Sequence, residues 1–130
     1  MNNQFFLNII ILCMFASSIS CNGSSSTAGY GKIVTFKKDK TISFPDFKLT
    51  YIGERKETSK FPNGNEFTFT YYDFTLKKDN EEKTVSWTAG TGDIGPINFE
   101  FAGNKFMIEL RYWEKGKKNL DDDELVITKL

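Results

Sequence analysis

The sequence predicts an all-β fold, a small antiparallel β-sandwich of immunoglobulin-like type with seven or eight strands, and a small β-barrel is the alternative. Two observations predict it. After Tyr30 no segment has the apolar spacing of a helix, and strand-like alternation recurs at short intervals between Gly, Asn and charged clusters. Most of the 13 Phe residues lie in these segments, which is enough for a core without disulfides.

Alternation of apolar and polar residues defines the expected strands, and turn-forming residues separate them. In chain order they cover residues 32–38, 41–44, 46–53, 66–77, 83–88, 97–102, 105–113 and 124–130. The length allows one domain, so residues 30–130 are expected to form a single β domain.

The segment 97–113 predicts a β-hairpin, because Gly103-Asn104 is a two-residue turn that tolerates positive φ. This turn would make three apolar pairs on one face, namely Phe101–Phe106, Phe99–Ile108 and Ile97–Leu110. The opposite face would carry Asn98, Glu100, Met107, Glu109, Arg111 and Trp113.

The segment 66–77 changes its phase in the middle. Aromatic residues occupy odd positions up to Tyr71, and apolar residues occupy even positions from Tyr72 onward. An extra residue at Tyr71-Tyr72 would restore one buried face, so the pattern predicts a β-bulge there that re-aims Asp73. The alternative is a long strand that buries one half on each face.

The first twenty residues carry no Asp, Glu, Lys or Arg, and Phe5 to Ile19 forms an apolar stretch. At about 15 residues it is shorter than the roughly 20 that span a bilayer, which predicts a signal peptide over residues 1–20. The small residues Ser18 and Ser20 lie three residues and one residue before Cys21.

This arrangement resembles the lipobox of bacterial lipoproteins. The resemblance implies cleavage before Cys21, a lipid anchor on Cys21 that holds the protein to a membrane, and a place in the bacterial cell envelope. Asn22 in place of Asp favours the outer membrane, facing the periplasm. Residues 21–29 would then be a lipidated flexible tether. Ordinary secretion after Ser20 and an uncleaved anchor are the alternatives.

Composition and motifs exclude several classes of function. Equal numbers of basic and acidic residues, 17 each, argue against a nucleic-acid partner. The chain has no His, and both Cys residues lie at or before position 21, so Ser-His and Cys-His pairs and zinc sites with N or S ligands are excluded from the domain.

Two motifs fail on their context. Gly90 to Gly95 spells G-x-G-x-x-G, but Pro96 and a strand follow it instead of a helix. Residues 121–124 resemble half of a calcium loop but lack its glycine, and they are expected to form a self-neutralising charged loop. We therefore expect no cofactor and no metal.

An enzyme would have to use carboxylates, and Glu100 and Glu109 are the pair that the predicted hairpin brings together as diagonal neighbours. A glycosidase-like site is the less favoured interpretation, because alternating charges on an outer strand face are usually solvated.

The favoured hypothesis is a non-enzymatic protein-binding module of the envelope, for example a hydrolase inhibitor or an immunity-type protein, with an envelope protein as partner. A structural or ligand-carrying lipoprotein is the alternative. The expected contact residues lie in two loops and on the hairpin: Phe61, Pro62, Asn63, Gly92, Asp93, Ile94 and Trp113.

Overall fold

The computed structural model describes residues 27–89 and 95–130, which form strands and turns and no helix. The strands are β1 (Ile33–Thr35), β2 (Thr41–Ser43), β3 (Lys48–Lys60), β4 (Glu66–Lys78), β5 (Glu81–Ala89), β6 (Ile97–Phe101), β7 (Asn104–Leu110), β8 (Trp113–Glu114), β9 (Lys117–Lys118) and β10 (Glu124–Lys129). The predicted all-β class is confirmed.

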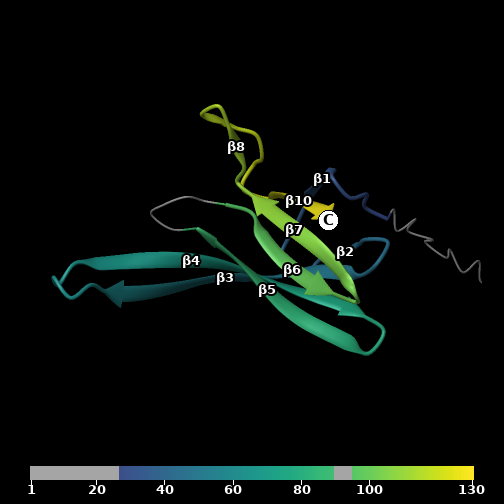
Figure 1. Cartoon of the computed structure of the whole chain (residues 1–130), viewed down its shortest axis with the longest axis horizontal. Helices are drawn as coiled ribbons and strands as arrows, with labels where there is room; N and C mark the ends of the chain where they lie inside the picture. The colour runs from purple at the N-terminus through teal and green to yellow at the C-terminus, as the bar shows by residue number, and fades with distance from the viewer. Residues whose placement is uncertain (1–26, 90–94) are drawn as a thin grey trace, which may run out of the picture.

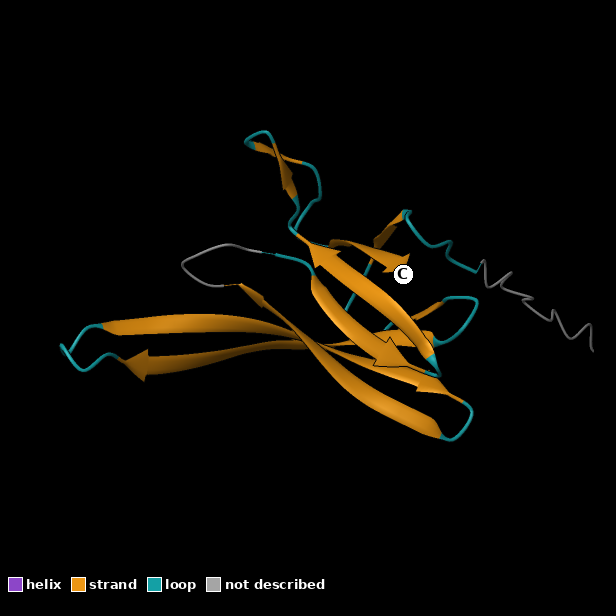
Figure 2. Ribbon diagram, viewed as in Figure 1, coloured by secondary structure: helices purple, strands orange, loops and turns teal. Residues whose placement is uncertain are grey.

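Eight of these strands form two four-stranded antiparallel sheets that pack face to face (Figures 1 and 2). The C-terminal sheet has the order β1-β10-β7-β6, and the meander sheet has the order β2-β3-β4-β5. The described strands therefore make a sandwich and not a closed barrel. An immunoglobulin domain places strands A, B, E and D in one sheet. Here one sheet consists of four consecutive strands, so the strand order differs from that of an immunoglobulin domain.

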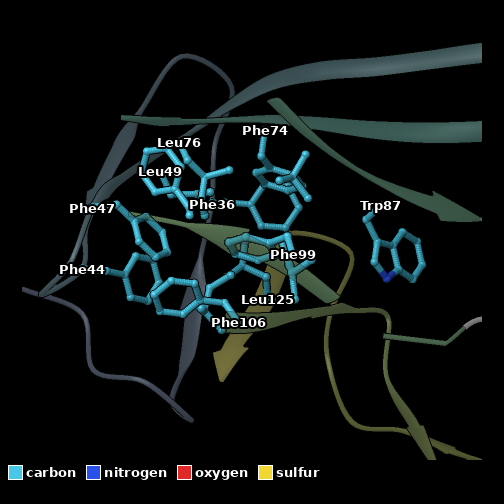
Figure 3. Close-up of a cluster of buried hydrophobic side chains, with 14 of the residues drawn as sticks. Phe36, Phe44, Phe47, Leu49, Phe74, Leu76, Trp87, Phe99, Phe106 and Leu125 are labelled. Carbon is cyan, nitrogen blue, oxygen red and sulfur yellow. The ribbon is translucent and has the colours of Figure 1, made fainter. Parts of the chain in front are cut away.

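The core lies between the two sheets and is mainly aromatic (Figure 3). Phe74, Leu76 and Trp87 reach it from the meander sheet and are fully buried, and Phe106 and Ile127 meet them from the C-terminal sheet. A core of this density stabilises the fold through apolar burial, at roughly 25 cal/mol per Å².

The predicted register of the β6–β7 hairpin is wrong by two residues. Phe99 pairs with Phe106, not with Ile108, and Phe101 pairs with Asn104. The turn is Ala102-Gly103, and both residues have positive φ, 48° and 75°, as a type I′ turn requires. A shift of two residues preserves the faces, so the side chains of the predicted apolar pairs still face the core, and all of them are buried except Ile97, which is partly buried.

The predicted bulge in β4 is wrong, because β4 pairs with β3 and β5 without interruption at Tyr71 and Tyr72. The irregularity lies in the partner strand β3, between Tyr51 and Gly53. Even-numbered residues from Tyr72 onward are buried against the C-terminal sheet, and the odd-numbered aromatic residues lie on the other face. The structure therefore agrees only in part with the alternative, because the two halves of the strand turn their apolar side chains to opposite faces but only the half from Tyr72 onward is buried.

The predicted strand 105–113 is too long. β7 ends at Leu110, because Arg111 adopts a φ of 51° that breaks the extended backbone. Trp113 belongs instead to the short β8–β9 ribbon, where its backbone pairs with that of Lys118. Its predicted position on the outer face of the hairpin is therefore wrong.

The chain joins the sandwich before Tyr30. The amide of Ala28 donates a hydrogen bond to the Ser43 carbonyl (2.7 Å), and Ala28 and Tyr30 pack against the core. The Tyr30 hydroxyl donates to Asp46 Oδ2 (2.8 Å), and Lys129 Nζ donates to the same oxygen (2.8 Å). This Tyr30–Asp46–Lys129 cluster ties the N-terminal segment to the last strand.

The cluster makes stability depend on pH. The hydrogen bonds from Lys129 and Tyr30 hold the pKa of Asp46 below its ordinary value. A carboxyl whose pKa is lowered by folding stabilises the fold above the unfolded pKa of about 3.9, and this contribution is lost as the pH falls through the folded pKa.

We therefore expect the wild type to be more stable than Asp46→Asn between about pH 5 and 8, and the difference to shrink below about pH 4. Urea unfolding of both proteins across this pH range measures it. A difference that stays constant down to pH 2 would contradict the role given to the Asp46 charge.

Candidate functional site: an aromatic arm

The β3–β4 hairpin extends well beyond the rest of the sandwich (Figure 1). We call residues 55–71 of this hairpin the arm. The last residue of β5, Ala89, pairs with Thr70. Between Thr70 and the tip of the hairpin, the described arm therefore consists of β3 and β4 alone. From Arg55 to Lys60 it is about 17 Å long at about 3.3 Å per residue.

One face of the arm carries four aromatic rings in contact, which we call the aromatic row: Phe61, Phe67, Phe69 and Tyr71. The distances between successive ring centroids are 4.3, 4.7 and 6.4 Å. None of the four belongs to the buried core cluster, and the Phe61 side chain is 51% exposed. The row is thus an apolar surface on the outer face of the meander sheet.

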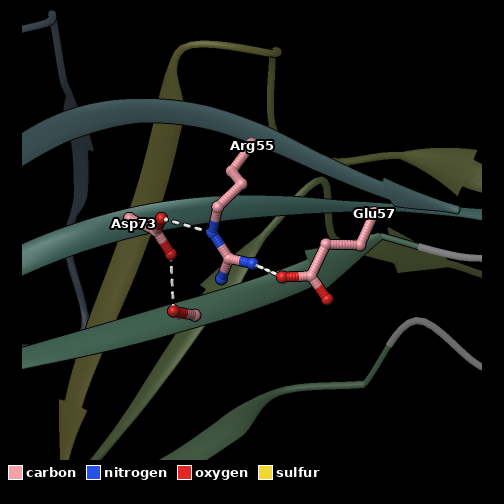
Figure 4. Close-up of polar contacts among 4 residues, drawn as sticks. Arg55, Glu57 and Asp73 are labelled. Carbon is pink, nitrogen blue, oxygen red and sulfur yellow. Dashed lines mark hydrogen bonds and ion pairs between the residues drawn. The ribbon is translucent and has the colours of Figure 1, made fainter.

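Arg55 lies at the inner end of the row, directly opposite Tyr71, and Figure 4 shows its contacts with Asp73 and Glu57. Its guanidinium carbon stands 4.3 Å from the centre of the Tyr71 ring, which is a cation–π contact. Its Nε donates to Asp73 Oδ2 (3.2 Å), and its Nη1 donates to Glu57 Oε1. Stacking and two carboxylates hold the guanidinium in one orientation.

Asp73 is held in turn by Ser86, whose hydroxyl donates to Asp73 Oδ1 (2.5 Å). Partial burial opposes ionisation of Asp73, but the hydrogen bonds from Ser86 and Arg55 and the charge of Arg55 outweigh it. The pKa of Asp73 therefore lies below its ordinary value. Such a charged, paired carboxylate suits a positioning role and not proton transfer at neutral pH.

The predicted contact residues have different outcomes. Phe61, Pro62 and Asn63 are exposed at the tip of the arm, where the Asn63 side chain accepts a hydrogen bond from the Asn65 amide (3.1 Å). Gly92, Asp93 and Ile94 lie outside the described residues, as does the side chain of Trp113. Cys21 and the predicted signal peptide lie outside them too.

The predicted carboxylate pair does not form. With the observed register Glu100 lies opposite Lys105, and its carboxylate is 3.5 Å from Lys105 Nζ. Glu109 is four residues further along β7, opposite Val126 of β10. Since diagonal neighbours are two residues apart, the two glutamates are not neighbours.

In the acidic loop before β10, Asp122 is paired with basic side chains. Asp122 accepts a hydrogen bond from Lys118 Nζ (2.7 Å), and the side chain of Glu124 accepts one from the Asp121 amide (2.8 Å). Within residues 27–89 and 95–130 no group of three His, Cys, Asp or Glu side chains could hold a metal ion.

Sequence reasoning found the tip of the arm but missed Phe67, Phe69, Tyr71 and Arg55. The signal was present, because the phase change in β4 marks the point where apolar side chains move from the inner to the outer face. Interpreting that change as a bulge returned all the aromatic residues to the core and so removed the row from consideration.

Comparisons with known protein families, with curated proteins and with solved structures find no match. The described residues contain no helix long and apolar enough to cross a membrane.

Proposed function

We propose that this protein is a lipid-anchored lipoprotein of the bacterial envelope, facing the periplasm from the outer membrane, and that its domain is a non-enzymatic protein-binding module. The arm is its contact surface, and the partner is another envelope protein. The observation that carries the proposal is the aromatic row, four rings outside the core on a hairpin that projects from the sandwich.

The orientation of the rings favours a protein over a sugar as the partner. The planes of Phe67 and Phe69 are 88° apart, and those of Phe69 and Tyr71 are 50° apart. Stacking of a sugar chain needs flat rings that share an orientation, whereas edge-to-face rings suit contact with protein side chains. Tyr and Arg are also the residue types that dominate protein interfaces.

The charge of the arm does not favour lipid as the partner. Its basic side chains are paired with acidic ones at the ion pairs Arg55–Glu57, Lys56–Glu54 and Lys60–Glu66. Counted with Glu54 at its base, the arm has three basic and three acidic side chains, and a surface without net positive charge gains no attraction to anionic lipids. The arm also lies at the opposite end of the long axis from the first described segment, where the proposed tether would join (Figure 1).

The alternative of a ligand-carrying lipoprotein requires an open cavity between the sheets. Between the described strands this space is filled by fully buried side chains such as Phe74, Leu76 and Phe106. The groove of about 640 Å³ beside β5 and β6 lies at one side of the sandwich and is open to solvent.

Removing two adjacent rings tests the arm. Phe61→Ser combined with Phe67→Ser should weaken capture of the envelope partner at least tenfold, because truncation of a good interface anchor costs at least ~2 kcal/mol. The free energy of unfolding should change by no more than about 0.5 kcal/mol at the exposed Phe61 and by about 1 kcal/mol at the half-buried Phe67. Affinity capture with quantitative mass spectrometry measures the first quantity, and urea unfolding measures the second.

Thr68→Ala is the matched control, since Thr68 lies between Phe67 and Phe69 in β4 but faces the other side of the arm. It should leave capture unchanged. If the double variant captures the partner as well as the wild type does, the interface is elsewhere. If the double variant is strongly destabilised, the row serves the fold.

A further inference from the structure

One side of the sandwich ends in two edge strands, which have no further strand beside them among the described residues. β5 is the last strand of the meander sheet, and β6 is the last strand of the C-terminal sheet. Between them lies an open groove of about 640 Å³ with Val85, Phe99 and Phe106 among its lining residues. Edge strands next to an apolar groove are sites where a further strand can add to a sheet.

The register of β6 determines which of its backbone groups are free. The Ala102-Gly103 turn makes Phe101 and Asn104 a hydrogen-bonded pair, so Phe99 and Phe101 direct their backbone groups toward β7. The N–H and C=O groups of Asn98 and Glu100 therefore point outward, along the open edge. An added strand would need these groups.

The side chain of Lys83 occupies this edge. Lys83 lies on the inward face of β5, in phase with the buried residues Val85 and Trp87, yet it is exposed. It crosses the groove, and its Nζ donates a hydrogen bond to the Glu100 carbonyl (2.9 Å). In the described part of the chain no carboxylate lies within 4.0 Å of this ammonium.

We propose that the Lys83 side chain blocks the open edge of β6 and so keeps it from pairing with the same edge of a second copy of this chain. Its ammonium group occupies the Glu100 carbonyl as a hydrogen-bond acceptor and places a positive charge where an added strand would lie. Inward-pointing charges are one device by which natural sheets protect their edges.

The second copy is the occupant because the β6 edge is self-complementary. A two-fold axis through Phe99 would set Asn98 of one copy opposite Glu100 of the other, twice. Asn98 and Glu100 are the two residues with outward backbone groups, so both of these residue pairs could form their backbone hydrogen bonds. No like charges would face each other across the new pair.

The test compares the self-association of variants of the full chain by sedimentation equilibrium in a detergent matched to the buffer density. Lys83→Met keeps the length of the side chain and removes the charge, and Lys83→Thr keeps the strand propensity if the Met variant is unstable. Either should raise the dimer association constant at least tenfold over the wild type. Lys83→Arg, which retains a donor and the charge, should not.

Two further variants locate the effect. Lys77→Met removes another exposed lysine from the same sheet and should leave association unchanged. Adding Asn98→Pro to Lys83→Met removes the outward N–H of β6 and should restore the wild-type constant. The proposal is overturned if Lys83→Met and Lys83→Thr associate no more than the wild type, if Lys77→Met has the same effect, or if Asn98→Pro does not reverse it.

Discussion

Replacing Phe106 with Ala should destabilise the domain by about 3–5 kcal/mol, which is a large part of the 5–15 kcal/mol that a small domain has in total. The Phe106 side chain is fully buried, and its ring centre lies 5.0 Å from that of Phe47 and 5.4 Å from that of Phe99. The truncation therefore removes contacts with β6 and with the connection between β2 and β3, and it leaves a cavity that close-packed neighbours cannot fill. Urea unfolding at neutral pH measures the loss.

Asn98→Ala is the control for this truncation, because Asn98 belongs to the same hairpin and is exposed on its other face. Its effect on the free energy of unfolding should stay within about 0.5 kcal/mol. Similar losses from both variants would mean that both faces of the hairpin are buried, contrary to the structure.

Cys21→Ser should abolish the incorporation of labelled fatty acid and leave the precursor uncut. The reason is that the peptidase implied by the lipoprotein resemblance acts only after the cysteine has been acylated. Labelling in a bacterial host followed by gel electrophoresis measures both results, and the wild type is expected to be fully processed and membrane-bound.

Ser17→Ala is a suitable companion variant, since it changes a small residue in the same region without touching the thiol. It should be processed and labelled as the wild type is. If Cys21→Ser instead yields a correctly cut soluble protein, then ordinary secretion after Ser20 describes the chain and the lipid anchor does not exist.

Alternation in the sequence predicted which side chains of β6 and β7 are buried but not how the two strands pair. Any even shift of register keeps Phe99 and Phe106 on the inner face, so the apolar pattern cannot separate one from another. The position of the turn decides the register. Residue propensity makes Ala102 a poor candidate for the first turn position, because an L-residue with a positive φ, here 48°, costs roughly 1–2 kcal/mol.

The arm could be anticipated only in part, for a related reason. The phase change at Tyr71-Tyr72 was visible in the sequence, but the side that each half of β4 faces depends on how far the opposite sheet extends. That extent is a tertiary property. The contacts of Arg55 with Tyr71, Asp73 and Glu57 arise from pairing between β3 and β4, and no local pattern in either strand announces them.

The arm and the core occupy different stretches of the same two strands. None of the buried core residues lies between Leu49 and Tyr72 in the chain, so the whole arm stands outside the set of side chains that hold the sheets together. Substitutions along the arm leave that set of core side chains intact. The length of the arm can also vary, because connecting hairpins on a protein surface tolerate insertions and deletions. Under the proposed function, this lineage could therefore diversify its recognition surface in step with a changing partner, at little risk to folding.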